Sequence, residues 1–200
     1  LTPEDFSKVT FLSVSTGLKG PKVKDLTFLQ QCPNLQSIFL QGPEVKNPSP
    51  LAGTTKLNMI NLSSNQISDL SPLAKLPAVK EVGLQGNQIK NLAPLAGVKT
   101  SEELRLDRNQ ITDLTPLGGL TVLRELSLNE NQVASFKPLA GLVQLEELGI
   151  TKNPARDFLS LASLAKLKSI TFSPPEGTKL VPVLGPMKAL EHVHISGTVM

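Results

Sequence analysis

The sequence lacks the large aromatic residues around which many globular cores are built. It contains no Trp and no Tyr, and aromatic residues occupy only 4% of its 200 positions. Hydrophobic residues nevertheless make up 40% of the chain. The core must therefore consist mainly of aliphatic side chains, and a globule centred on aromatic clusters is not expected.

Cysteine and histidine are equally scarce. A single cysteine, Cys32, excludes an intrachain disulfide. We expect Cys32 to be a small buried hydrophobic residue, because it takes the position that Leu76 holds in a later, similar segment. The two histidines, His192 and His194, lie two positions apart and could share a metal. A zinc site needs three or four ligands, and no further ligand is assured nearby, so we expect no metal.

Catalytic patterns are also missing from the sequence. It contains no nucleophile with a basic partner, no Gly-rich phosphate loop and no H-E-x-x-H. We therefore expect a domain that is not an enzyme and that carries no cofactor.

Neither a strong charge nor a long apolar run is present. Lys and Arg number 20 against 17 Asp and Glu, and no basic cluster is interleaved with aromatics, so a nucleic-acid partner is not expected. No apolar run approaches the ~18 residues of a membrane span. Because the sequence begins with Leu1 rather than Met, we expect a fragment from which a signal peptide or anchor could have been removed.

What the sequence does contain is a repeat of 22 residues. Similar units begin at Leu57, Val79, Ser101, Leu123 and Leu145. Each unit follows the pattern L-x-x-L-x-L-x-x-N-x-I with a few substitutions, and the first four continue with a tail resembling D-L-x-P-L. This is the leucine-rich repeat signature, and an internal repeat of this period indicates a solenoid.

The repeat pattern predicts how the units stack. Ile60 and Leu62 lie two positions apart, and therefore on one side of a short strand. One unit cannot bury its apolar side alone, so neighbouring units must share a core and form a parallel sheet. We predict an α/β repeat solenoid, a right-handed leucine-rich repeat horseshoe or arc with a concave parallel sheet and a convex side of short 3-10 turns and loops. About nine strands are expected, beginning near residues 9, 35, 57, 79, 101, 123, 145, 167 and 190.

Two recurring positions follow each strand. An asparagine column is predicted to satisfy backbone groups of buried turns, because an amide both donates and accepts hydrogen bonds. A hydroxyl followed by proline, as in Ser71-Pro72 and Thr115-Pro116, predicts an N-cap and a first helical residue. The asparagine column consists of Asn65, Asn87, Asn109, Asn131 and Asn153.

The chain ends depart from the repeat. Residues 1–8 are predicted to form a short capping helix, and residues 9–200 a single leucine-rich repeat domain. The segment 18–23 is an insertion, Pro43 replaces the asparagine of its unit, and Pro174 and Pro175 interrupt the eighth unit. The last strand is expected to be an open edge unless a cap follows. We expect a monomer, with an edge-to-edge dimer through that strand as the alternative.

Outward strand positions form the concave surface, where two features stand out. Phe11, Phe39 and Met59 converge at the N-terminal end, either as an interaction site or packed against the cap or the insertion. Four glutamates occupy one column and repel one another, so a basic partner or a cation would relieve them; alternatively they are simply solvated. The predicted partner contacts are Phe11, Phe39, Met59, Glu81, Glu103, Arg105, Asp107, Glu125 and Glu147.

The motif N-Q-I-x-D-L-x-P-L and the opening T-P-E-D-F…V-T-F-L resemble bacterial internalin-type leucine-rich repeat domains. The resemblance implies a secreted or surface-attached domain that binds a protein, often a host receptor. Eukaryotic phosphatase-regulating leucine-rich repeat proteins share the 22-residue unit, so an intracellular scaffold or regulatory subunit in the cytoplasm remains open. Recognition of a carbohydrate or other cell-envelope ligand, or a role as the substrate-selecting part of a longer enzyme, also remains open.

Overall fold

The computed structural model describes residues 3–15, 23–42 and 44–196 of the chain. Strands of a parallel sheet alternate along the sequence with short 3-10 helices (η). One short α-helix precedes the first strand, and another precedes the last strand. The strands are β1 (Phe11–Ser15), β2 (Ser37–Gln41), β3 (Met59–Asn61), β4 (Glu81–Gly83), β5 (Glu103–Arg105), β6 (Glu125–Ser127), β7 (Glu147–Gly149), β8 (Ser169–Phe172) and β9 (His192–Ile195). The helices are α1 (Pro3–Ser7), η1 (Thr27–Gln31), η2 (Ser49–Gly53), η3 (Ser71–Lys75), η4 (Ala93–Gly97), η5 (Thr115–Leu117), η6 (Lys137–Gly141), η7 (Phe158–Ser163) and α2 (Val181–Leu184).

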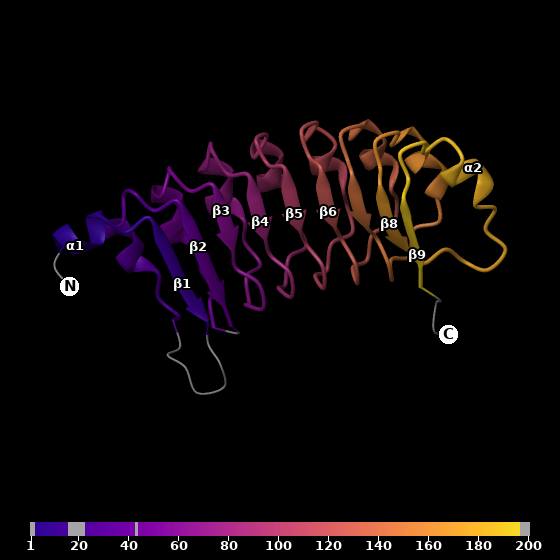
Figure 1. Cartoon of the computed structure of the whole chain (residues 1–200). Coiled ribbons are helices and arrows are strands. Elements are labelled where there is room, and N and C mark those ends of the chain that lie inside the picture. Colours follow the sequence, from indigo (N-terminus) through magenta and orange to yellow (C-terminus); the bar gives the residue numbers. More distant parts are fainter. Residues whose placement is uncertain (1–2, 16–22, 43, 197–200) are drawn as a thin grey trace.

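Across these described residues, nine strands form one parallel sheet whose spatial order is the order of the sequence. The strands lie side by side along an elongated stack, with α1 at one end and α2 beside β9 at the other (Figure 1). Each residue pairs with its equivalent one unit later, as Glu81 does with Glu103. The predicted repeat solenoid and its register are confirmed.

The strands begin two residues later than the repeat pattern suggests. β3 starts at Met59, although Leu57 opens the unit. The N–H of Leu57 donates to the carbonyl of Thr54 at 3.1 Å, so Leu57 still belongs to the preceding turn. Its side chain is nevertheless completely buried. The first leucine of a unit is thus a core residue placed by a turn, not by a strand.

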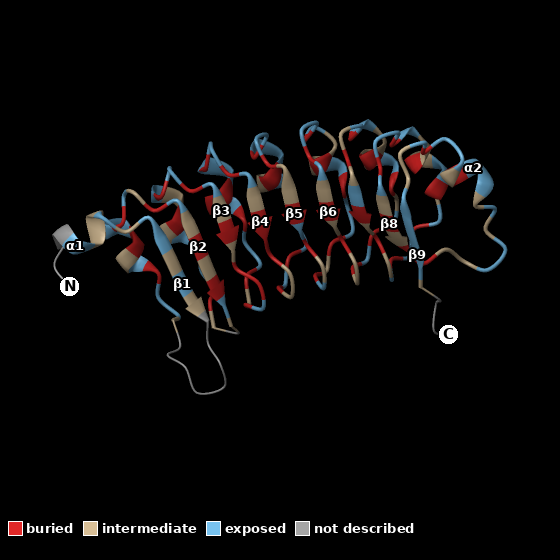
Figure 2. Ribbon diagram, in the orientation of Figure 1, coloured by how far each residue is buried: buried red, intermediate tan, exposed pale blue. Residues whose placement is uncertain are grey.

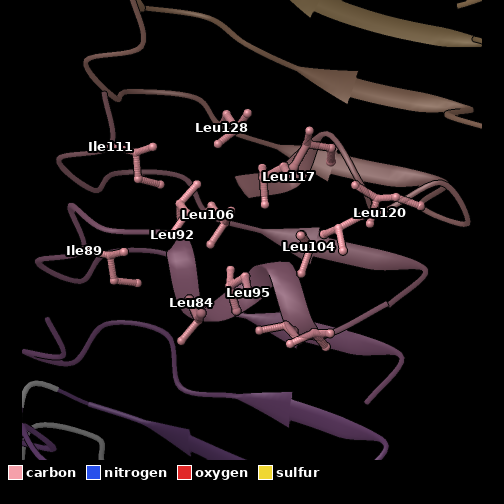
Figure 3. Packing of buried hydrophobic residues seen from close by; sticks show 14 of the residues in the cluster. Leu84, Ile89, Leu92, Leu95, Leu104, Leu106, Ile111, Leu117, Leu120 and Leu128 are labelled. Atoms are coloured by element: carbon pink, nitrogen blue, oxygen red, sulfur yellow. The ribbon is translucent and has the colours of Figure 1, made fainter. Parts of the chain in front are cut away.

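The core is a continuous column of aliphatic side chains between the sheet and the 3-10 helices. Leu104, Leu106, Ile111 and Leu117, all from one turn of the solenoid, are 0% exposed. Buried segments run along the whole stack in Figure 2, and Figure 3 shows side chains of successive units packed on one another. Cys32 is buried as predicted, and burial raises the pKa of its thiol.

The asparagine column is buried and hydrogen-bonded as predicted. The Nδ2 of Asn87 donates to the carbonyls of Leu62, at 2.9 Å, and Leu84, at 3.0 Å. Its Oδ1 accepts the N–H of Ile67 at 2.9 Å. One amide therefore binds backbone groups of two consecutive coils. At these turns the side chain takes the place of a backbone hydrogen-bond partner.

The predicted hydroxyl N-cap was wrong. Ser71 is the first residue of η3, and no side chain hydrogen-bonds the helix from the N-cap position, Leu70. The carboxylate of Asp69 instead accepts both the N–H and the hydroxyl of Ser71, each at 2.8 Å. The proline half of the pattern holds, since Pro72 lies in the first turn of η3. The unit therefore places its capping group two residues before the hydroxyl.

The two ends of the stack differ. At the N-terminal end, Phe6 of α1 is partly buried against the core. At the C-terminal end, the side chains of Val193 and Ile195 in β9 are 44% and 47% exposed, although their partners Ile170 and Phe172 are buried. Residues 16–22, which include most of the predicted insertion, and Pro43 lie outside the described residues, as do Leu1 and Thr2.

Candidate functional site

The outward-facing side chains of the sheet form one continuous concave face. Because the register is unshifted from β1 to β9, residues at equivalent positions stand in columns across the strands. The predicted contact residues thus lie on one surface, and their binding of a partner stays a prediction. The first column reads Phe11, Ser37, Met59, Glu81, Glu103, Glu125, Glu147, Ser169 and His192.

An apolar patch, defined as Phe11, Phe39 and Met59, occupies the N-terminal end of this face. The rings of Phe11 and Phe39 lie 5.5 Å apart between centroids and are tilted by 40°. Phe11 is 59% exposed, and the other two side chains are half-buried. Such tilted ring pairs are favourable contacts, and the exposed ring leaves an apolar surface open to solvent.

The glutamate ladder, defined as Glu81, Glu103, Glu125 and Glu147, crosses the four central strands β4 to β7. Strands ~4.8 Å apart bring each pair of carboxylates close enough to repel by about 0.9 kcal/mol even in water. Burial raises the pKa of Glu103, the Arg105 guanidinium opposes this, and the other three carboxylates of the ladder add to the rise. Arg105 Nε lies 2.6 Å from Glu103 Oε1, so Glu103 has a cationic partner.

Two cations next to the ladder in the sequence, Lys80 and Arg124, are engaged elsewhere. Lys80 pairs with Glu102 at 3.2 Å, and Arg124 pairs with Glu146 at 2.9 Å. Both pairs lie in the column that precedes the strands. In that column positive and negative side chains alternate from unit to unit, so each can form an ion pair with its neighbour in the same column. Within the described residues, no ion pair reaches Glu81, Glu125 or Glu147.

A hydrogen-bonded ladder of polar side chains follows the carboxyl ends of the strands. The Oδ1 of Asp107 accepts three hydrogen bonds. Two come from Asn129, from its backbone N–H at 2.9 Å and its side-chain Nδ2 at 2.6 Å, and the third comes from the hydroxyl of Ser127. Asn129 in turn accepts the N–H and the hydroxyl of Thr151, each at 2.8 Å. Asp107, predicted as a partner contact, therefore also orders its neighbouring units.

A groove of about 290 Å³ lies on the concave face across β5 to β8. Gly149 is one of the residues that line it, and an added Cβ there would lie 2.7 Å from Asn129 Nδ2. Sequence reasoning missed this groove, although a glycine in an outward column was visible as a signal. The side chains around it include Arg105, Asp107, Glu125 and Glu147.

The structure also locates the two histidines and possible metal ligands. In the part of the chain that the structure describes, no three His, Cys, Asp or Glu side chains are grouped so as to hold a metal. His192 and His194 are both exposed on β9. No described helix is both long enough and apolar enough to cross a membrane.

These features define a leucine-rich repeat solenoid, and comparisons with known proteins agree. The sequence matches the family described as Leucine Rich repeats (2 copies) over residues 55–97 and 102–141. Internalin C2 of Listeria monocytogenes is 31% identical, with a TM-score of 0.88, over 98% of this chain and 84% of the other. The chain therefore belongs to the internalin family of leucine-rich repeat proteins.

Two further solved structures are similar. An internalin, InlF, of Listeria monocytogenes is 27% identical with a TM-score of 0.80, over 88% of this chain and 52% of that protein. A leucine-rich repeat protein of Leptospira interrogans shares the fold, with 17% identity and a TM-score of 0.70 over 99% of this chain and 58% of the other. The chain thus spans about half of these two relatives. None of the curated proteins matches the sequence.

Proposed function

We propose that this chain is a non-catalytic recognition domain that binds a protein partner on its concave face. The observation that carries the proposal is the contrast between the core positions and the outward positions of each unit. Core leucines and buried asparagines repeat from unit to unit, whereas the outward columns change from phenylalanine to glutamate to histidine. A scaffold that repeats beneath a surface that varies is suited to selecting a ligand.

The size of the concave face favours a macromolecule. Nine described strands, ~4.8 Å apart, give a surface about 38 Å long. The face combines an exposed aromatic pair at one end with charged groups in the middle. Protein interfaces have this composition, with aromatic anchors and a polar surround.

We further propose that the protein is secreted or displayed on a bacterial surface, as its membership of the internalin family implies. In this proposal the chain acts as a single leucine-rich repeat domain, and α1 covers the first open end of the core through Phe6. A monomer is proposed. An edge-to-edge dimer through β9 is the alternative, and light scattering over a range of protein concentrations distinguishes the two.

A charge-swap experiment tests the binding face. The variant Glu125→Lys/Glu147→Lys changes the concave face, and Lys75→Glu/Lys137→Glu changes exposed residues of the 3-10 helices. Surface proteins of candidate host cells are captured with each variant and with the unmodified chain, and the bound proteins are quantified. We expect the concave variant to lose partners that the 3-10 variant retains. Identical capture by all three proteins contradicts binding on the concave face.

A further inference from the structure

The groove over Gly149 suits a side chain with a charged end. Its lining is mostly polar and includes Ser127, Asn129 and Thr171. The side chains of Leu126 and Leu148 are instead buried in the core. The side chains of Asn129 and Ser127 lie against Gly149, where an added Cβ would collide with them, so a side chain bound there meets polar groups. At about 290 Å³ the groove lies just below the usual range of small-molecule pockets, ~300–1,000 Å³, and it is open to solvent. Lysine and arginine carry a cationic head on a stem long enough to enter such a groove.

The charge around the groove is negative. Asp107 and the single cation Arg105 both line it, but Arg105 is paired with Glu103 and Asp107 binds Ser127 and Asn129. The other two carboxylates, of Glu125 and Glu147, face each other from adjacent strands. They form no ion pair and no hydrogen bond with any other described residue. A cation between them would relieve their mutual repulsion.

A second, independent feature of the same face points to a protein rather than a free cation. Phe11 is 59% exposed and contacts Phe39 at 5.5 Å between ring centroids. A free cation bound in the groove would leave this aromatic pair exposed to solvent. An apolar side chain of a protein partner would cover it. The concave face therefore offers two anchor points of different chemistry.

The sheet fixes the distance between the two anchor points. Phe39 on β2 and Gly149 on β7 belong to one column and are separated by five strand steps. At ~4.8 Å per step the separation is about 24 Å. An extended peptide advances ~3.3 Å per residue, so about seven residues cover this distance.

We propose that the concave face binds an extended protein segment through two anchors: a Lys or Arg side chain in the groove over Gly149, between Glu125 and Glu147, and an apolar side chain on the apolar patch about seven residues away. This inference rests on the proposed function, and it adds the chemistry and the spacing of the partner.

A peptide library displayed on phage, with random segments of about 12 residues, tests both anchors. The library is selected in parallel against four immobilised proteins. These are the unmodified chain, Glu125→Gln/Glu147→Gln, Phe11→Ser, and the control Lys75→Gln/Lys137→Gln. Thermal melting confirms that each variant is folded. We expect the unmodified chain and the control to enrich peptides with Lys or Arg six to eight positions from a large apolar residue. The glutamine variant should lose the basic residue from its enriched peptides, and Phe11→Ser should lose the apolar one.

Synthesis of one enriched peptide then gives a quantitative result. Replacement of its basic residue by Gln should weaken binding about tenfold or more, and the difference should shrink at high salt. The inference is overturned if no peptide is enriched, or if enriched peptides lack the paired residues or bind the glutamine variant equally well. Peptides that lack the pair but are lost with Glu125→Lys/Glu147→Lys leave the proposed function intact. Peptides that bind that charge-swap variant unchanged count against both.

Discussion

The side chain of Asn109 binds the main chain of Leu84, 25 positions earlier, with 3.0 Å between Nδ2 and the carbonyl oxygen. The same amide donates to Leu106 at 3.0 Å and accepts the N–H of Ile89 at 3.0 Å. One residue thus satisfies backbone groups of its own coil and of the preceding one. Asn65, Asn87, Asn131 and Asn153 repeat the arrangement, so the stack is held by hydrogen bonds as well as by its leucine core.

Replacement of this amide should therefore be costly. Asn109→Leu leaves buried carbonyl and N–H groups without partners, and we expect a loss of about 1–3 kcal/mol in the free energy of unfolding. Urea unfolding followed by circular dichroism measures the change. Gln132→Leu, an exposed position after the next strand, is the control and should have little effect. An unchanged melting temperature for Asn109→Leu contradicts a structural role for the column.

The carboxylate of Asp69 orders the first turn of η3, because it accepts two hydrogen bonds from Ser71. We expect Asp69→Ala to lower the free energy of unfolding by about 0.5–1 kcal/mol at neutral pH. Asp69→Asn retains an acceptor and should lose less. Parallel urea titrations of the three proteins give the order, and equal stability of all three refutes the capping role.

The contribution of Asp69 should also depend on pH. The backbone N–H and then the hydroxyl of Ser71 hold the pKa of this carboxyl below its ordinary value of 3.8. A lowered pKa in the folded state stabilises the fold above the ordinary pKa, and the stabilisation is lost as the pH falls through the folded value. The difference between the unmodified chain and Asp69→Ala should therefore stay constant above the ordinary pKa of 3.8 and shrink as the pH falls below it. A constant difference rules out this linkage.

Glu103 should behave in the opposite way. Burial raises its pKa, and the other three ladder carboxylates add to the rise, although Arg105 opposes it. A raised pKa means that the ionised form destabilises the fold, so stability falls as the pH rises through the folded pKa. We expect Glu103→Gln to stabilise the protein by about 0.5–1 kcal/mol at neutral pH and to make no difference in acid. Thermal melting at several pH values checks the sign, and a less stable Glu103→Gln at neutral pH shows that the Arg105 ion pair dominates.

Two glycines of one outward column form a matched pair for a packing prediction. A Cβ at Gly149 would lie 2.7 Å from Asn129 Nδ2 and 3.1 Å from Ser127 Oγ. At Gly83 the nearest atoms, Asn61 Cγ and Gln85 Oε1, would lie at 3.2 Å. We expect Gly149→Ala to cost about 1–3 kcal/mol through displaced hydrogen-bonding side chains. Gly83→Ala should cost less, because the reduced entropy of the unfolded chain offsets a milder contact. Chemical denaturation gives both values, and a larger loss for Gly83→Ala reverses the prediction.

Much of the fold could be predicted from the sequence because the repeat imposes it. Leu104 and Leu106 alternate with Glu103 and Arg105, and each set recurs every 22 residues, so the pattern fixes both the side that faces the core and the register between strands. The hydroxyl N-cap failed for a local reason. Ser71 and Asp69 are both good capping residues, and their spacing alone did not show which would accept the hydrogen bond.

The sequence by itself determined the solenoid, its columns and the burial of Asn109, because these follow from a short period and from the need to bury leucines and satisfy turns. The tertiary structure decided the rest of the concave face: the pairing of Lys80 with Glu102, the engagement of Asp107 by Asn129, and the groove over Gly149. Long or polar side chains reach several partners of similar energy in a neighbouring coil. Their choice depends on distances across the sheet, which a linear pattern does not contain.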